Sequence, residues 1–194
     1  MSRLESLSPE AKRQLFSPDA DSDLIVLVTF YDDSTVEPTV LARICDGVGF
    51  ELNTTTGERT AVRVSETANE VLYGVKKKVI VNNQIVTEEF IYLPLQITLP
   101  SEEEAQAPRC SITINDVTRY LTPIIRGLTK PPRVKLELVL SKTPNLVEVD
   151  FDYLYVTNIT YNRDTVNCEV SMISYEREPF PVHSFNPPNF PGLF

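Results

Sequence analysis

The chain has 194 residues and a formal net charge of −9, with 42% hydrophobic and 23% charged residues. This length and balance are typical of one globular domain, with or without terminal arms. The negative charge disfavours a nucleic-acid reader, which needs clustered Lys and Arg to displace counterions. No run reaches the ~18 apolar residues of a membrane-spanning helix, so we predict no membrane span. The N-terminal residues lack an apolar signal-peptide core, and we expect a protein assembled in a cytoplasm.

Residues 1–22 are predicted to form a short helix followed by a linker. The Ser8 hydroxyl can accept a hydrogen bond from a backbone amide in the first helical turn, and Pro9 suits the first helical position. Glu10 favours the positive end of the helix dipole, and Ser17-Pro18 should stop the helix after Phe16. We therefore expect a docking helix over residues 8–16.

Residues 23–177 change to the pattern of strands. Residues 24–31 form a nearly continuous apolar run, so both faces of this segment are apolar. That is typical of a strand buried on both faces. Residues 40–44 and 48–52 are predicted strands around a Cys-Asp-Gly-Val-Gly turn. The apolar residues in these segments predict a β-rich domain.

The segments 71–81 and 85–93 predict a hairpin, because the Asn82-Asn83 pair between them tolerates positive φ. Lys76 to Lys78 should lie opposite Glu88-Glu89 on a solvated edge, where ion pairs contribute little. Residues 54–90 are polar and weakly patterned, so this region can project from the body of the domain.

Residues 95–99 and 109–114 are further predicted strands, separated by an acidic loop that contains Glu102 to Glu104. Asn115 or Asp116 can cap a following helix, in which Pro123 should introduce a kink and Gly127 can form the end. The apolar positions of this helix follow one stripe, namely Val117, Leu121, Ile124, Ile125 and Leu128.

The stretch 133–140 alternates most clearly. Its apolar positions, Val134, Leu136, Leu138 and Leu140, should face the core, while Lys135 and Glu137 should face water. Residues 151–161 and 166–175 predict a second hairpin around residues 162–164. We predict that one face of its first arm carries an aromatic stripe, formed by Phe151, Tyr153, Tyr155, Ile159 and Tyr161. Such a stripe is more typical of a core or a subunit contact than of a ligand site.

These elements together predict a mainly β fold. We expect an antiparallel β-sandwich or barrel with one packed helix, a short N-terminal helix and an extended C-terminal arm.

No known catalytic or metal-binding pattern is present, so we predict a non-enzyme without a cofactor or metal. Cys45, Cys110 and Cys168 are far apart, and the last two alternate with apolar residues in the manner of core positions. The single histidine, His183, has no neighbouring histidine or cysteine to complete a zinc site. Phosphate-binding glycine motifs and paired metal ligands on a helix are missing.

Residues 178–194 combine proline and phenylalanine in Glu-Pro-Phe-Pro-Val-His-Ser-Phe-Asn-Pro-Pro-Asn-Phe-Pro-Gly-Leu-Phe. Proline excludes an inner strand or a helix interior, and the rings need a groove. We predict a stiff extended arm that lies along its own domain or along a neighbouring subunit. Its candidate contact residues are Phe180, Phe185, Phe190, Pro191, Gly192, Leu193 and Phe194.

Four motifs resemble a domain-of-unknown-function family of tailed bacteriophages. They are L-Q-I-T-L-P (95–100), R-C-S-I-T-I-N-D-V (109–117), L-T-K-P-P-R-V-K-L-E-L-V-L (128–140) and the ending with F-P-G-L-F (190–194). The resemblance covers residues 95–194 well and the first half loosely. Members are encoded among tail-tip genes, so the resemblance implies a minor tail or baseplate hub protein. Some relatives bind an iron–sulfur cluster through an extra cysteine-rich domain. The three cysteines of this sequence are far apart, so we do not expect that cofactor here.

The resemblance implies a virion protein in a ring that joins the tail tube to the tip and through which DNA leaves. Expected partners are further copies of the chain and other tail-tip and tail-tube proteins, and a tape-measure protein is a further candidate. A tail-assembly factor absent from the virion and a carbohydrate-binding β-sandwich module remain alternatives. We expect no specific nucleic-acid binding.

Overall fold

The computed structural model describes most of the predicted β-rich domain and the N-terminal helix. The described residues are 7–16, 22–34, 37–52, 59–67, 70–81, 83–98, 109–116 and 119–172. The predicted C-terminal arm at 178–194 and the acidic loop at 101–108 lie outside them.

The fold is mainly β, as the sequence predicts. Ten strands form one sheet in the order β5-β6-β7-β2-β1-β10-β11-β12-β9-β8, and β3 pairs separately with β4. The strands are β1 (Leu24–Asp32), β2 (Thr39–Cys45), β3 (Phe50–Leu52), β4 (Arg59–Ala61), β5 (Arg63–Thr67), β6 (Glu70–Val81), β7 (Gln84–Tyr92), β8 (Leu95–Thr98), β9 (Arg109–Asn115), β10 (Arg133–Leu140), β11 (Thr143–Tyr161) and β12 (Thr165–Met172). The strand pairs are antiparallel except for β2 and β7, which pair in parallel, so the sheet is mostly antiparallel.

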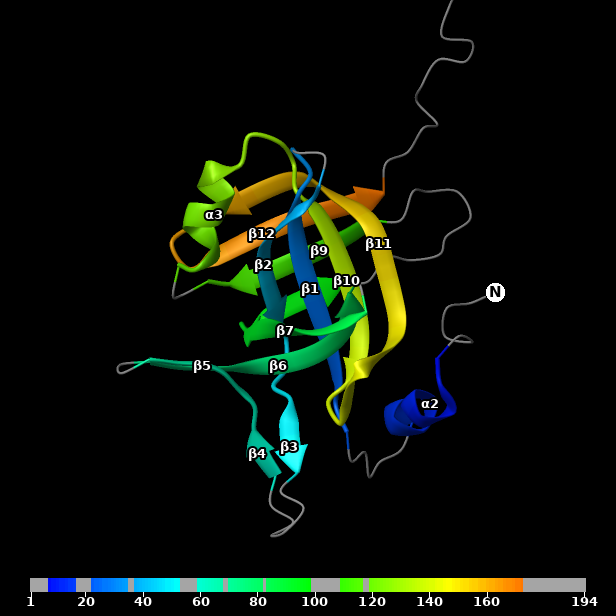
Figure 1. Cartoon of the computed structure of the whole chain (residues 1–194). Coiled ribbons are helices and arrows are strands. Elements are labelled where there is room, and N and C mark those ends of the chain that lie inside the picture. Colours follow the sequence, from blue (N-terminus) through cyan, green and yellow to red (C-terminus); the bar gives the residue numbers. More distant parts are fainter. Residues whose placement is uncertain are drawn as a thin grey trace, which may run out of the picture.

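The sheet curls around one large apolar core (Figure 1). That core collects inward side chains from β1, β2, β9, β10, β11 and β12. The sheet does not close by hydrogen bonds, but β7 continues directly into β8 through Leu93-Pro94. The Leu93 amide donates to the Cys45 carbonyl of β2 at 3.0 Å, and the Asn115 amide of β9 donates to the Pro94 carbonyl at 2.8 Å. One continuous stretch of chain therefore joins the β2 side of the curl to its β8 edge.

The predicted core strand and the cysteine positions are confirmed. Val134, Leu136, Leu138 and Leu140 are all buried, and so are Cys110 and Cys168 with their alternating apolar neighbours. The six residues from Ile25 to Phe30 of β1 are buried without a break, which confirms a strand covered on both faces. Two layers must therefore cover β1.

The α3 helix (Leu121–Gly127) covers one end of the core, beside β2 and β12 in Figure 1. Asp116 does cap it, since its carboxylate accepts hydrogen bonds from the amides of Tyr120, Leu121 and Thr122. The helix starts later than the sequence predicts, so Pro123 lies in its first turn and the predicted kink is wrong. An amide in the first turn has no helical acceptor in any case, so proline is tolerated there.

The α2 helix (Pro9–Phe16) confirms the predicted N-terminal helix. The Ser8 hydroxyl accepts a hydrogen bond from the Ala11 amide at 3.1 Å, and the Ser8 hydroxyl and amide both donate to the Glu148 carboxylate of β11. Leu7 and Ala11 pack on Leu140 in a small separate core. The cap thus fixes the helix and also ties it to the sheet.

The predicted aromatic stripe on β11 is wrong. Phe151 is buried, but Tyr153 and Tyr161 are exposed, while Leu154 and Val156 point into the core. Tyr153 has φ 59°, and the register of β11 shifts near it and again before Asn158. Each bulge moves the following side chains to the opposite face, which breaks a strict alternation.

The hairpin of β6 and β7 forms a second layer over the outer face of β1 and β10 (Figure 1). Gly74 lies where β6 meets the β3–β4 region, and its amide and carbonyl bond to Val62 and Gly49. A Cβ at Gly74 would overlap the carbonyl of Phe90 in β7, so only glycine lets β6 and β7 pair at this point. Part of the region predicted to project therefore packs on the body.

Candidate functional site

The base of the β6–β7 hairpin is held to the body by apolar contacts. Val75 and Phe90 point inward and are completely buried. They pack against the outward face of the main sheet, through Ile25, Leu27, Cys45 and Val139. Burial of these side chains gives the hairpin one fixed position on β1 and β10.

A buried group of charges continues this contact along the hairpin. The Lys77 ammonium lies 2.6 Å from one oxygen of Glu137 in β10, and Lys135 lies 2.7 Å from the other oxygen. Both Lys77 and Glu137 are buried. Two predictions are therefore wrong: Lys77 is not on a solvated edge, and Glu137 does not face water. The hairpin covers the face of β10 that the alternation assigns to solvent.

The pKa of Glu137 reflects this environment. Burial opposes ionisation and is the largest single influence, but the hydrogen bonds and charges of Lys135 and Lys77 together outweigh it. The pKa of the Glu137 carboxyl therefore lies below its usual value. The carboxylate stays charged, and it holds two lysines from different layers together.

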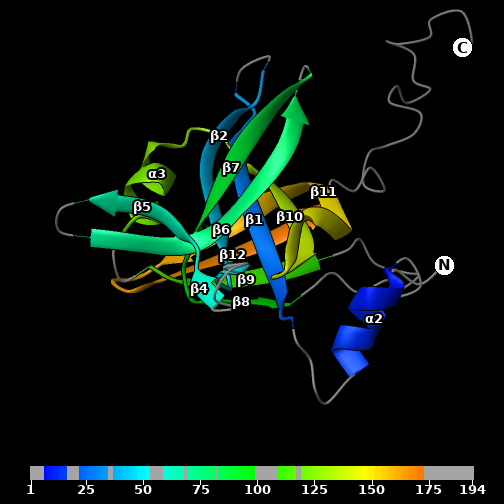
Figure 2. The ribbon, with the colours of Figure 1, turned by 60° about the horizontal axis from the view of Figure 1, so that its bottom comes forward.

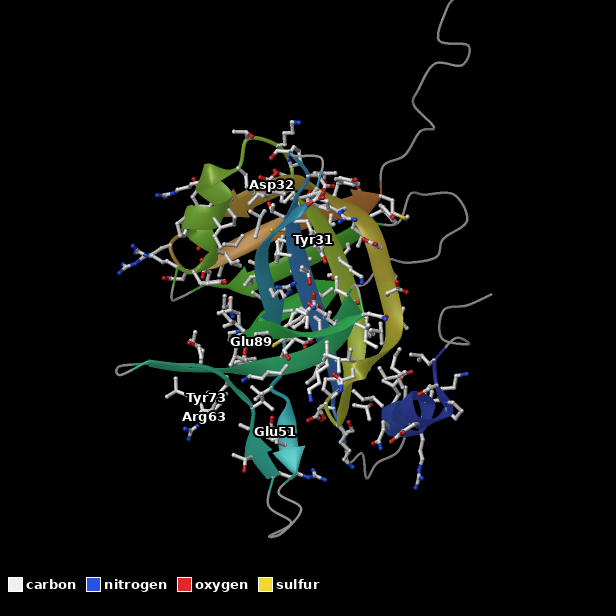
Figure 3. The ribbon with its side chains drawn as sticks, in the orientation of Figure 1. Tyr31, Asp32, Glu51, Arg63, Tyr73 and Glu89 are labelled. Atoms are coloured by element: carbon white, nitrogen blue, oxygen red, sulfur yellow. The ribbon has the colours of Figure 1, made fainter. Side chains whose placement is uncertain are left out.

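A second ion pair joins the same two layers. The Arg43 guanidinium of β2 lies 2.8 Å from the Glu88 carboxylate of β7, and both side chains are partly buried. Near this pair, burial raises the pKa of the Tyr31 hydroxyl, which lies toward the upper end of β1 in Figure 3. The guanidinium of Arg133 lies 4.7 Å from the centre of the Tyr31 ring. The hairpin base is thus fixed by both packing and charge.

The tip of the hairpin has the opposite character. Asn83 adopts φ 62° at the turn, as the sequence predicts for this hairpin. Ile80 is 73% exposed and its cross-strand neighbour Ile85 is 71% exposed. Val81 and Val86 are also exposed, and no charged residue occurs from Val79 to Thr87. Natural edge strands usually carry charge or proline, so an uncharged aliphatic tip is a marker of a contact surface.

Both edges of this tip are open. β2 pairs with β7 only at Ile91 and Tyr92, and β5 pairs with β6 only up to Tyr73. Among the described strands, residues 76–81 of β6 and 84–89 of β7 pair only with each other. Just before the tip, the Lys78 amide donates to the side-chain oxygen of Asn145 in β11 at 2.7 Å. Figure 2 shows this hairpin extending away from the strands behind it. We call residues 79–81 and 83–87 the hairpin tip.

Exposed side chains also gather on the opposite part of β6. Tyr73 lies opposite Arg63 of β5 in register, and Figure 3 shows both near the lower left of the ribbon, above β4. Tyr73 is partly exposed. Lys76 and Glu89 form a more exposed ion pair at 3.4 Å farther along the hairpin. The Lys76–Glu89 pair confirms one predicted pairing of charges across the hairpin, whereas Lys77 and Glu88 form ion pairs with Glu137 and Arg43 of other strands.

The residues predicted for the interaction arm, Phe180 to Phe194, lie outside the described residues and stay a prediction. The three cysteines are buried and unpaired, and burial raises the pKa of Cys45 and Cys168 to about 12 and that of Cys110 to about 11. Within the described part of the chain, no group of three potential metal ligands comes together. No described helix is both long and apolar enough to cross a membrane.

The sequence contains a usable signal for the hairpin tip. Val79-Ile80-Val81 and Ile85-Val86 flank the Asn82-Asn83 turn, so aliphatic residues continue to the very end of a hairpin that should project. A comparison of the chain with protein-family models gives no match, and a comparison with curated proteins gives none either.

Proposed function

We propose that this protein is a structural subunit whose copies join through the hairpin tip. The observation that carries the proposal is the combination of exposed aliphatic side chains and two unpaired strand edges on one rigidly anchored hairpin. An open edge offers a row of amides and carbonyls to another strand, and apolar side chains add specificity.

The two edges lie on opposite sides of the same hairpin, so they favour a head-to-tail contact. The β7 edge of one copy would pair with the β6 edge of the next copy. A contact between two different surfaces repeats from copy to copy, and it closes into a ring when the rotation permits. A ring of identical subunits is therefore the assembly that this geometry supports best.

The resemblance to phage tail-tip proteins gives this ring a proposed place. It would join the tail tube to the tip of a tailed bacteriophage, and DNA would leave through it. The C-terminal arm, with Phe180, Phe185 and Phe190 to Phe194, would dock on a neighbouring tail-tip subunit. A tail-assembly factor would use the same surfaces but would be missing from purified particles. Measuring the copy number of the chain in purified particles therefore distinguishes the two roles.

The proposal is tested by placing charge on the hairpin tip. The full chain should sediment as an oligomer that grows with concentration, whereas the double variant Ile80→Asp, Ile85→Asp should remain monomeric. Phe16→Asp, at an exposed apolar position at the end of α2, is the matched control and should assemble like the wild type. A wild-type chain that stays monomeric at every concentration, or a double variant that still assembles, would contradict the proposal.

A further inference from the structure

A second surface, far from the hairpin in sequence, brings together three arginines. Arg119 precedes α3, Arg126 lies in the last turn of α3, and Arg163 lies in the turn between β11 and β12. Together with Thr122, Tyr161 and Asn162 they line an open cleft of about 340 Å³. Its volume is near the lower end of the ~300–1,000 Å³ range of small-molecule sites.

The arginines of this cleft form no ion pair with the described residues. No carboxylate of the described chain forms an ion pair with Arg119, Arg126 or Arg163, in contrast to Arg43 and Arg133. The contrast is informative because the whole chain has a net charge of −9. Three unpaired guanidinium groups make a local positive field in an acidic protein.

The carboxylate that precedes α3 is already satisfied. Asp116 is buried and accepts hydrogen bonds from three backbone amides and from the Thr122 hydroxyl. These contacts and the Arg119 amide, which donates to the Asp116 carbonyl at 2.9 Å, shape the turn before α3. Arg119 is held there with φ 56°, in the left-handed region. Asp164 follows Arg163 but does not line the cleft.

The Asn162 side chain adds a further donor to the cleft, whereas the Thr122 hydroxyl already donates to Asp116. The Asn162 side-chain oxygen accepts from the Asp164 amide at 3.0 Å and from the Thr165 amide at 2.8 Å. This leaves the NH₂ group of the Asn162 side chain as a donor. The Arg126 guanidinium lies 5.5 Å from the centre of the Tyr161 ring, which orients it at the cleft. Donors therefore outnumber acceptors around the open volume.

We propose that this cleft binds a phosphate ester of a small molecule. Three guanidinium forks match the several oxygens of a phosphate group, which can accept more charge-assisted hydrogen bonds than one carboxylate can. The cleft volume leaves space for an organic group attached to the phosphate, and the exposed part of the Tyr161 ring offers it an apolar surface. The proposal is independent of assembly through the hairpin tip.

Calorimetric titration of the full chain tests the site with four probes: inorganic phosphate, glucose 6-phosphate, adenosine monophosphate and acetate at matched ionic strength. A phosphate ester should bind saturably and more tightly than inorganic phosphate, and acetate should bind weakest. The two esters distinguish a sugar from a nucleoside as the attached group. Equal binding of all four anions, equal binding of inorganic phosphate and both esters, or no saturable binding would overturn the proposal.

Variants locate the binding in the cleft. Arg126→Gln and Arg163→Gln should each weaken binding of the preferred ester by about tenfold or more, because each removes charge-assisted hydrogen bonds. Arg13→Gln on α2 is the matched control and should bind like the wild type. The Ile80→Asp, Ile85→Asp chain should also keep its affinity, which separates this site from assembly. Unchanged affinity in both cleft variants, with thermal stability equal to the wild type, would contradict the assignment.

Discussion

The base and the tip of one hairpin differ in almost every physical respect. At the base, Val75 and Phe90 are buried, and Lys77 shares the Glu137 carboxylate with Lys135. At the tip, Ile80 and Ile85 are exposed, and no described strand pairs with the outer edges. The two regions are only a few residues apart on the same strands.

This difference separates two roles of apolar and charged side chains. The base uses both kinds to fix the hairpin on the sheet, so its residues contribute to the stability of the single chain. The tip makes few contacts within the chain, so its aliphatic side chains should contribute mainly to contacts with another copy. Substitutions at the two regions should therefore affect different measurements.

The largest contrast is expected between Phe90 and Ile85. Phe90→Ala removes a completely buried ring and should lower the free energy of unfolding by about 3–5 kcal/mol. Ile85→Ala removes an exposed side chain and should change it by less than about 0.5 kcal/mol. Urea unfolding of the two variants under monomeric conditions measures this difference. Similar losses at both positions would show that the tip also packs within the chain.

The buried and exposed ion pairs provide a second contrast. Glu137→Leu leaves the Lys77 ammonium buried without its counter-ion and should cost about 3 kcal/mol, near the lower limit measured for broken buried pairs. Glu89→Leu breaks the more exposed pair with Lys76 and should cost about 0–1 kcal/mol. The same unfolding experiment compares them. If Glu137→Leu were as stable as the wild type, the charge group would not be holding the hairpin.

The pH dependence of stability should depend on Glu137. Its pKa in the folded chain is lowered, so its contribution is fully present above the pKa of the unfolded chain, about 4.3. That contribution is lost as the pH falls through the lower pKa of the folded state. As the pH falls from about 5 to below the folded-state pKa of Glu137, the Glu137→Gln variant should therefore lose less free energy of unfolding than the wild type does. This pH window is set by the unfolded-state and folded-state pKa values of Glu137. Parallel stability curves for the two proteins would contradict the lowered pKa.

Local patterns were sufficient to predict much of the fold. The unbroken apolar run in β1 predicted its burial, the alternation from Val134 to Leu140 predicted the core face of β10, and Ser8-Pro9 predicted the start of α2. Each of these signals depends on neighbouring residues only. The parallel pairing of β2 with β7 depends on segments distant in sequence, and no local pattern specifies it.

The candidate sites show the same limit. The alternating pattern of β10 predicts that Glu137 is solvated. The prediction fails because a hairpin covers this strand and brings Lys77, 60 residues away in the sequence, to the Glu137 carboxylate. The bulge at Tyr153 reverses the faces of β11 and removes the aromatic stripe that strict alternation predicts. Similarly, Arg163 meets Arg119 and Arg126 only because the β11–β12 turn folds beside α3.

Hydrogen exchange at the hairpin tip tests the central claim most directly. The backbone amides of residues 84–87 should exchange at least about tenfold more slowly in a concentrated, assembled sample than in a dilute, monomeric one, because strand pairing would protect those on the open edge. The Phe90 region at the base should exchange slowly in both samples. Equal exchange of residues 84–87 in the two samples, with protection appearing elsewhere on assembly, would contradict the assignment of the hairpin tip as the contact between copies.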